Sequence, residues 1–216
     1  MTSSPRKRAI DPQRRAEIGQ ERRARTRARI LAETFDIFGR ENGLYARVEE
    51  VCTAAGITRQ TFYNHFSGMD ELREALAWEV SHDFLVEVTA ILDTLPDAAS
   101  RTAAAIRYYL GRGRDDPRWA WSVVNLSASG IVFGAETFAQ ALKTVDEGMQ
   151  SRAFVLPDAR IGRDIVMGAT LSALFTQLRE ETPNTYPASV AQAVLAGLGC
   201  SFSEARAIAA MSLPVL

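Results

Sequence analysis

The chain has 216 residues, of which 47% are hydrophobic and 24% are charged, so it can bury one large core or two small ones. It has no apolar run near the ~18 residues needed to cross a bilayer, and no apolar stretch follows its basic start as in a secretory signal. Its two cysteines and two histidines lack the paired spacing of a structural zinc site. We therefore expect a cytoplasmic protein with no metal and no other cofactor.

Charge is distributed unevenly along the chain. Residues 1–29 contain ten basic and three acidic residues, a net charge of +7, whereas residues 30–216 carry −8. An imbalance of this kind indicates a polyanionic partner for the basic end, although a solvated basic tail without a partner has the same composition. Residues 1–21 also lack apolar periodicity, so they are predicted to form a flexible basic arm.

A longer amphipathic helix is predicted from Arg22 onward. Apolar side chains recur on one of its faces between Ile30 and Phe38, with charged residues on the other faces. Asn42 and Gly43 are expected to end it, because both residues tolerate the left-handed conformation of a helix C-terminus.

Two short helical segments then meet at Ala55 and Gly56, within the stretch VEEVCTAAGITRQTFYNHF (48–66). These two small residues allow the backbones to approach closely, and Thr58 can cap the second segment. Phe62 and Phe66, four residues apart, form the inward face of that segment. The pattern is typical of a helix-turn-helix.

The inward face leaves a set of hydrogen-bonding side chains on the outside of the second segment, namely Arg59, Gln60, Thr61, Tyr63, Asn64 and His65. In a helix-turn-helix, the first residues of the second helix reach base edges in the major groove, where Arg suits guanine and Gln suits adenine. Tyr63 and His65 suit the phosphate backbone. A polar surface helix of an unrelated bundle is the alternative, and the basic end of the chain favours the DNA-binding interpretation.

The remaining elements are predicted to be helical as well. Ser67 resembles the capping residue of a helix that runs to Leu95, and Asp116-Pro117 resembles a later helix start. Further helices are expected at about 98–112, 117–127, 131–153, 158–180, 187–198 and 203–211, and no sustained period-two run predicts a strand. The fold class is therefore all-α. No nucleotide-binding, hydrolase or metalloprotease motif is present, so we do not expect an enzyme.

The segment ILAETFDIFGRENG, followed by VEEVCTAAGITRQTFYNHFSGMDEL, resembles the N-terminal domain of TetR-family transcriptional regulators over about residues 25–76. The resemblance implies a helix-turn-helix DNA-binding domain at 22–76 and an effector-binding and dimerisation domain at 77–216. It also implies DNA contacts from Arg59, Gln60, Thr61 and Tyr63, with His65 at phosphates, and we add Arg47, Thr58 and Asn64 as candidates. Two positions depart from the family pattern, because Arg47 replaces the usual cap of the first short helix and Met69 replaces a common lysine.

Large aromatic residues are concentrated in one part of the C-terminal half. Tyr108, Tyr109, Trp119, Trp121, Phe133 and Phe138 are candidate walls of a pocket for a small apolar or aromatic effector. Core packing is the plainer explanation for any single one of them. The pocket is therefore a hypothesis that the positions of these side chains can support or weaken.

We predict a homodimeric, ligand-responsive repressor that binds an inverted-repeat DNA operator and releases it when a small-molecule effector binds. The helices at about 158–180 and 187–198 carry small residues that permit close approach, and the family resemblance implies that this pair forms the dimer interface. Packing within one monomer would use the same residues. Two other functions stay open: an effector-independent DNA binder or activator, and an all-helical carrier or enzyme with a non-functional basic tail.

Overall fold

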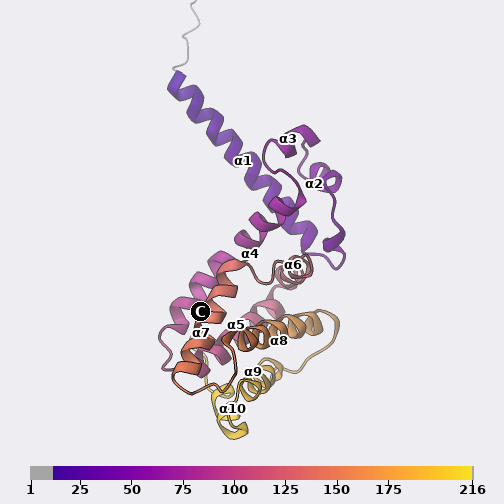
Figure 1. Ribbon diagram of the computed structural model, residues 1–216. Helices are drawn as coiled ribbons and strands as arrows, with labels where there is room; N and C mark the ends of the chain where they lie inside the picture. Colours follow the sequence, from indigo (N-terminus) through magenta and orange to yellow (C-terminus); the bar gives the residue numbers. More distant parts are fainter. Residues whose placement is uncertain (1–11, 216) are drawn as a thin grey trace, which may run out of the picture.

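The computed structural model describes residues 12–215, and every regular element in that range is a helix (Figure 1). The elements are α1 (Pro12–Phe38), the short 3-10 helix η1 (Gly43–Tyr45), α2 (Val48–Ala54), α3 (Arg59–Tyr63), α4 (Met69–Leu92), α5 (Ala98–Asp115), α6 (Pro117–Ala128), α7 (Ala135–Gln150), α8 (Ala159–Arg179), α9 (Tyr186–Gly197) and α10 (Phe202–Ala209). The all-α prediction is confirmed. No helix within the described range is long and apolar enough to cross a membrane.

Two large hydrophobic cores divide the described residues, and α4 contributes to both, while a third, smaller cluster joins Val88 and Leu92 of α4 to Ala104 and Tyr108 of α5. The smaller core joins α1, α2, α3 and the first half of α4 around Phe38, Phe62 and Phe66, which are almost completely buried. The larger core joins α5 to α10, with Leu174 and Leu195 among its fully buried residues. Burial of each such side chain stabilises the folded state by about 1.5–3 kcal/mol. In Figure 1, the helix-turn-helix lies at one end of α4 and the bundle of later helices at the other.

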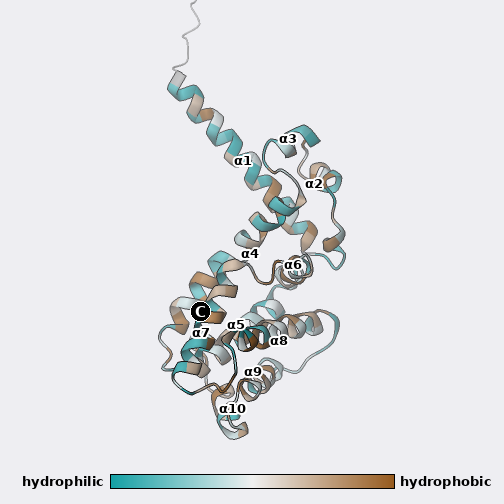
Figure 2. Cartoon of the chain, viewed as in Figure 1, coloured by the Kyte–Doolittle hydropathy of each residue, from teal (hydrophilic) through white to brown (hydrophobic). Residues whose placement is uncertain are grey.

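The first helix, α1, begins at Pro12 rather than at Arg22. The flexible arm expected at 1–21 is therefore helical from Pro12 onward, and its first part, residues 1–11, lies outside the described residues. No apolar pattern marks this segment, because the side chains at 13–25 are all exposed and this half of α1 is mostly hydrophilic (Figure 2). Arg, Ala, Glu and Gln nevertheless favour helix, and proline is tolerated in the first turn.

Helix α4 starts without the predicted side-chain cap. Gly68 precedes it in an extended conformation, and no side chain bonds the amides of the first turn. The Glu71 carboxylate instead accepts a 2.7 Å hydrogen bond from the backbone N–H of Ser67, which lowers the pKa of Glu71. The acidic partner is Glu71, one residue after the Asp70 of the expected capping box, so that box does not form.

The helix predicted from residue 131 begins at Ala135. Phe133 and Gly134 have φ angles of 54° and 82°, in the left-handed region, and this interrupts the helical path. A Cβ atom at position 134 would lie 2.9 Å from Ser81 Oγ on α4, so glycine is needed for the close approach. The turn places the Phe133 ring in the larger core.

Helix α6 fastens the helix-turn-helix domain to the bundle. The buried Asn125 amide donates two 2.8 Å hydrogen bonds, to the carbonyl oxygens of Phe38 and Arg40 at the end of α1. The Trp119 indole N–H donates to the Val80 carbonyl oxygen of α4 at 2.9 Å. These side-chain hydrogen bonds to backbone carbonyls hold α6 against both α1 and α4.

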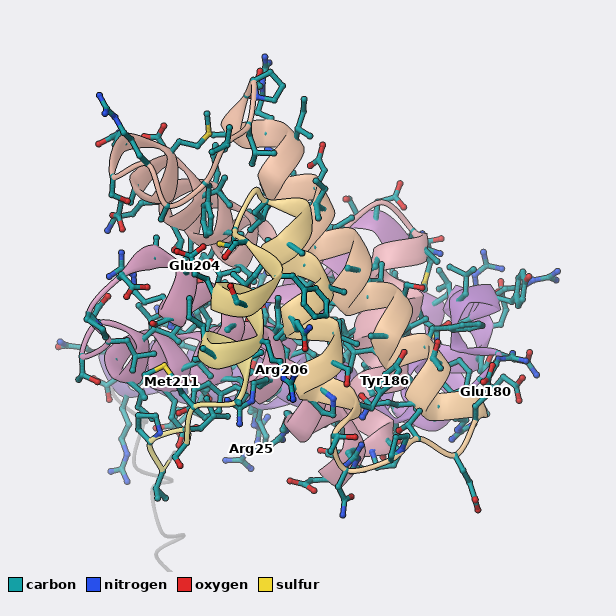
Figure 3. All side chains as sticks on the ribbon, turned by 90° about the horizontal axis from the view of Figure 1, so that it is seen from below. Arg25, Glu180, Tyr186, Glu204, Arg206 and Met211 are labelled. Atoms are coloured by element: carbon teal, nitrogen blue, oxygen red, sulfur yellow. The ribbon has the colours of Figure 1, made fainter. Side chains whose placement is uncertain are left out.

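Helices α9 and α10 form the end of the molecule opposite the helix-turn-helix, and α8 lies between α6 and α9 (Figure 1). Seen from below, α10 with Glu204 and Arg206 covers part of this end, and the loop from Glu180 to Tyr186 joins α8 to α9 (Figure 3). A capping box starts α10, since Ser201 Oγ accepts from the Glu204 N–H and the Glu204 carboxylate accepts from the Ser201 N–H. One side of α8 and one side of α9 are exposed to solvent along the length of each helix.

Candidate DNA-binding and effector sites

Helices α2 and α3 form the predicted helix-turn-helix. The turn between them passes through Gly56, whose φ of 60° lies in the left-handed region that favours glycine. Thr58 Oγ1 accepts a 3.1 Å hydrogen bond from the Thr61 N–H and so caps α3, as the sequence predicted. Arg47 precedes α2 without a side-chain cap, also as predicted. Phe62 is completely buried beneath α3, which turns the rest of this short helix outward.

The predicted DNA contacts are gathered around α3. Arg47, Thr58, Arg59, Gln60, Tyr63 and Asn64 are exposed, whereas Thr61 and His65 are half-buried. All except Arg47 lie within residues 58–65. A duplex that touches the first turn of α3 is therefore within reach of most of these side chains.

Two of these side chains already have partners on the protein surface. Arg59 Nη1 lies 3.0 Å from Glu49 Oε1 of α2, and both side chains are largely exposed. The pKa of Arg59 is raised by a hydrogen bond with Tyr63 and by the nearby charge of the Glu49 carboxylate, so Arg59 stays positively charged. Gln60 Nε2 donates to Asn64 Oδ1 at 3.2 Å. DNA contact by Arg59 or Gln60 must therefore exchange one exposed polar partner for another.

Helix α1 supports α3 from behind with two arginines one turn apart. Arg23 Nη2 donates to the Asn64 carbonyl oxygen at 3.1 Å, and Arg27 Nη1 donates to the His65 carbonyl oxygen at 3.2 Å. These carbonyls follow the end of α3, where cations are favourable. Burial, with the two arginine charges nearby, lowers the pKa of His65. His65 is therefore neutral at pH 7 in the free protein and can act there as a neutral hydrogen-bonding group.

A stripe of arginines runs along the exposed side of α1, consisting of Arg14, Arg15, Arg22, Arg25 and Arg29. Their side chains are exposed, and none of them has an ion-pair or hydrogen-bond partner within residues 12–215. At 100° per residue, they fall on the side of α1 away from Arg23 and Arg27. Like charges at helical spacing repel one another, so a polyanion placed alongside would stabilise this part of α1.

A cavity of about 70 Å³ lies in the C-terminal bundle between α4, α5, α7 and α8. Its walls are mainly apolar, with Val88 from α4, Ile106 from α5 and Met167 from α8. At one side, Arg101 donates a 2.7 Å hydrogen bond to the Glu147 carboxylate. A small concave site with a few polar groups is the usual form of an effector site.

The six aromatic residues predicted for the effector pocket do not all meet in this cavity. Tyr109 and Phe133 line it, and Trp119 packs behind Tyr109 with ring centroids 6.0 Å apart. Tyr108 points elsewhere and donates a 2.7 Å hydrogen bond to the Pro214 carbonyl oxygen. Trp121 packs edge-on against Phe175, and Phe138 lies 3.8 Å below the Arg163 guanidinium, along a separate groove beside Trp78.

Comparison with family models identifies the two halves of the chain. Residues 30–76 match the model of bacterial regulatory proteins of the tetR family, and residues 97–211 match that of a tetracyclin repressor-like C-terminal domain. The chain belongs to the tetR family. It is therefore a DNA-binding transcriptional regulator with an N-terminal helix-turn-helix domain. A search of curated proteins gave no match.

Solved structures share the fold of this TetR-family regulator. RolR in complex with its ligand resorcinol matches with a TM-score of 0.70 and 22% sequence identity, covering 91% of this chain and 98% of RolR. The transcriptional regulator FadR from Bacillus subtilis in complex with stearoyl-CoA gives a TM-score of 0.61 at 16% identity, with 79% of this chain and 96% of FadR covered. A tetR-family protein from Rhodococcus RHA1 gives 0.58 at 15%, covering 82% of this chain and 98% of that protein.

In this TetR-family regulator, the sequence predicted none of the polar cavity lining except Tyr109, which was named for its aromatic ring. Thr102 and Tyr109 of α5 and Thr137 and Thr144 of α7 all line the cavity. Each pair is separated by seven residues, two helical turns, and therefore lies on one helix face. The threonine hydroxyls on otherwise apolar faces of the predicted helices could have indicated this polar lining. Aromatic residues alone do not indicate it.

Proposed function

We propose that this regulator is a homodimeric repressor that binds an inverted-repeat operator and releases it when a small-molecule effector binds in the C-terminal bundle. The observation that carries the proposal is the outward face of α3. Arg59, Gln60 and Tyr63 are exposed above a completely buried Phe62, so the core fixes the helix and leaves these side chains for a duplex. The unpaired arginines of α1 add positive charge at the same end of the molecule, on the side of α1 that faces away from α3 (Figure 1).

The side chains divide by chemistry into base-reading and phosphate-binding groups. Arg59 and Gln60, in the first turn of α3, suit guanine and adenine edges in the major groove. Thr58, Thr61, Tyr63, Asn64, His65 and Arg47 suit phosphates or sugars, which set the position of the protein but not its sequence preference. The Met69 backbone N–H at the start of α4 can serve a phosphate where the family has a lysine.

The dimer is proposed to form through α8 and α9. On α8 the exposed positions recur at three and four residues, at Ile161, Asp164, Gly168, Ser172, Phe175 and Arg179. On α9 the small residues Ala193, Ala196 and Gly197 are exposed. Continuous stripes of this kind can pack closely against the same stripes of a two-fold mate. A two-fold dimer would set its α3 helices about one DNA turn apart, ~34–36 Å.

The effector is proposed to act through α4. Leu85, Val88 and Leu92 of α4 line the cavity, while the first half of the same helix packs in the core beneath α3. An effector that fits better when α4 is displaced would change the spacing of the two α3 helices, because a ligand shifts an equilibrium only by its differential affinity. The fold shared with RolR and FadR, which were solved with resorcinol and stearoyl-CoA, supports an effector site in this half.

Selection of bound sequences from random duplex DNA tests the proposal. The wild-type protein should enrich a short inverted repeat, and Gln60→Ala should change the preferred base at one symmetric position in each half-site, at a cost of ~1–3 kcal/mol. Binding without any preferred sequence would instead favour an effector-independent DNA binder. No DNA affinity at any salt concentration, together with tight ligand binding, would favour an all-helical carrier or enzyme.

A further inference from the structure

The N-terminal half of α1 extends beyond α3 and away from both large cores (Figure 1). Every side chain from 13 to 25 is exposed, and the first core residue of α1 is Ile30. A helix that is polar on all sides gains no stability from burial, and short helices in water are marginal without it. A partner that lies along this half would therefore stabilise it.

This part of α1 carries positive charge that no acidic group neutralises. Residues 12–29 contain seven arginines and two glutamates, a net charge of +5. Neither Glu17 nor Glu21 forms an ion pair within residues 12–215. The arginine stripe falls within an arc of about 100° around the helix and runs for about 22 Å along it, and its members are Arg14, Arg15, Arg22, Arg25 and Arg29. One side of α1 is thus a continuous row of free guanidinium groups.

The arginine stripe faces away from the duplex that α3 would read. Arg23 and Arg27 donate to the carbonyl oxygens directly after α3, so they mark the side of α1 that is turned toward α3. The centre of the stripe lies about 150° around the helix from these two residues. In the projecting half, the side turned toward α3 carries the uncharged Ala16 and Gln20. An operator beside α3 therefore leaves the stripe free for another polyanion.

The form of the stripe suits a double helix. A small anion can neutralise one or two of the arginines, whereas a duplex presents a negative charge about every 1.7 Å along its axis and can meet all five. Guanidinium groups match phosphate oxygens in geometry as well as in charge. Single strands are held largely by stacking of bases on aromatic side chains, and residues 12–29 contain no aromatic residue. A rigid row of phosphates is the better match.

An anionic membrane fits this helix poorly. A basic helix that lies on a membrane buries an apolar face opposite its charges. The one large apolar residue among residues 12–29 is Ile18, and helical geometry places it in the middle of the arginine stripe. The side opposite the stripe therefore has no apolar surface to insert between lipids.

We propose that the arginine stripe of α1 binds the phosphates of a second DNA duplex while α3 reads the operator. The inference rests on the proposed operator binding by α3 and adds a separate DNA surface to it. Phosphate contacts carry no sequence information, so the second duplex needs no operator. One regulator molecule can then link its operator to another segment of DNA.

A bridging assay with the full-length protein tests the second surface. Operator duplex is fixed to beads in excess over the protein, so that α3 is occupied, and a fluorescent duplex of random sequence is added. The beads should retain the fluorescent duplex in the presence of protein, and retention should fall steeply as salt rises, because bound phosphates release counterions. No retention at low salt, with the protein on the operator, would overturn the inference.

Variants assign the bridging to the stripe. In Arg14→Gln/Arg22→Gln, affinity for the second duplex should fall at least about tenfold, and the slope of log affinity against log salt should decrease by about 1.8, since each phosphate contact contributes about 0.9. Affinity for a short operator duplex should change less than about threefold, because exposed charges at a distance are screened. The matched control is Arg152→Gln/Arg206→Gln, which removes the same charge from exposed positions of the C-terminal domain and should change neither affinity.

A second pair of substitutions, Arg15→Gln/Arg25→Gln, guards against a local defect in the first. It should show the same loss of bridging, and circular dichroism should show that both variants keep their helices. Unchanged bridging in both variants would overturn the inference, because two associated dimers could then hold the two duplexes. A loss of operator affinity as large as the loss of bridging would also overturn it, since the stripe would then serve the operator. Single-stranded DNA that competes as well as duplex would exclude the double helix as the partner.

The outcomes separate this inference from the proposed function. Selection of an inverted repeat by a protein that never bridges would overturn the inference and leave the repressor function standing. In Arg59→Ala/Tyr63→Phe, duplex affinity that remains and then disappears on addition of Arg14→Gln/Arg22→Gln would support the stripe as a DNA surface. That result, in a protein whose wild type enriches no operator, would overturn the repressor function alone.

Discussion

Arg27 of α1 holds the backbone of His65 directly after α3. Its guanidinium donates a 3.2 Å hydrogen bond to the His65 carbonyl oxygen and lies 4.3 Å from the centroid of the Phe66 ring. A helix of five residues cannot hold its own position, because too few backbone hydrogen bonds form within it. The orientation of α3 therefore depends on contacts of this kind as well as on the buried Phe62.

Arg27→Ala should destabilise the protein by about 1–2 kcal/mol, through loss of one charge-assisted hydrogen bond and one cation–π contact. Operator affinity should fall as well, since α3 is less well held. The matched control is Arg29→Ala, which removes the same charge from an exposed position of α1 without a partner. Denaturant unfolding and fluorescence anisotropy with operator DNA give the two quantities. Equal losses of stability in both variants would contradict the role of Arg27.

The difference between α1 and α3 shows what the sequence could predict. The apolar spacing of Phe62 and Phe66, with Gly56 before them, located α3 and its outward face without coordinates. The N-terminal half of α1 has no such pattern, because its side chains face water on every side and only helix propensity maintains it. The contacts of Arg23 and Arg27 with α3 span about forty residues of sequence, and no local rule indicates pairs of that kind.

The effector site was predicted less completely than the DNA-binding face for a related reason. Which side of α5 faces a cavity depends on how α4, α7 and α8 pack around it, and their order in space is not encoded in the spacing within α5. Tyr108 and Tyr109 are adjacent in sequence but point to opposite surroundings, one to the C-terminal tail and the other to the cavity. Aromatic content alone could not separate them.

His65 should make stability dependent on pH. Burial and the charges of Arg23 and Arg27 lower its pKa from the usual 6.5, so the unfolded chain binds a proton more readily than the folded one. The stability contribution of neutral His65 is fully present above about pH 6.5 and is lost as pH falls through the lowered pKa. His65→Gln should flatten this part of the curve of unfolding free energy against pH. In an NMR titration, Arg23→Gln should raise the pKa of His65; an unchanged value would refute the electrostatic part of the explanation.

Glu49→Gln should tighten DNA binding. The Glu49 carboxylate holds Arg59 in an exposed ion pair, so removal of its charge frees Arg59 and also removes repulsion from phosphates. Glu50→Gln is the matched control, because it removes the same charge from the same helix without an ion pair within the described residues. Anisotropy titrations over a range of salt concentrations measure both variants. The pair competes with DNA only if Glu49→Gln raises affinity more than Glu50→Gln does.

Asn125→Ala should loosen the junction of the two domains. The two 2.8 Å hydrogen bonds to the Phe38 and Arg40 carbonyl oxygens are lost, and a destabilisation of about 1–3 kcal/mol is expected from the unsatisfied groups. The effector should then release DNA less completely, since α6 no longer ties α1 to the bundle. Ser122→Ala, on the same helix and with one longer bond of 3.4 Å to Phe35, is the control. An unchanged effector response in Asn125→Ala would mean that α4 alone carries the coupling.

Gly168→Gln should separate the dimer without harming the monomer. No atom lies within 4 Å of a Cβ at position 168, so the larger side chain fits the isolated chain, and replacement of a mid-helix glycine should stabilise α8 by roughly 0.5–1 kcal/mol. In a dimer packed through α8, the same side chain would occupy the space of the partner helix. Gly111→Gln in α5 is the matched control, since its Cβ also meets nothing within 4 Å. In sedimentation velocity, Gly168→Gln should be a monomer and Gly111→Gln a dimer. The operator affinity of Gly168→Gln should fall, because a single α3 reads only half of the repeat. A stable dimer in this variant would place the interface on another surface.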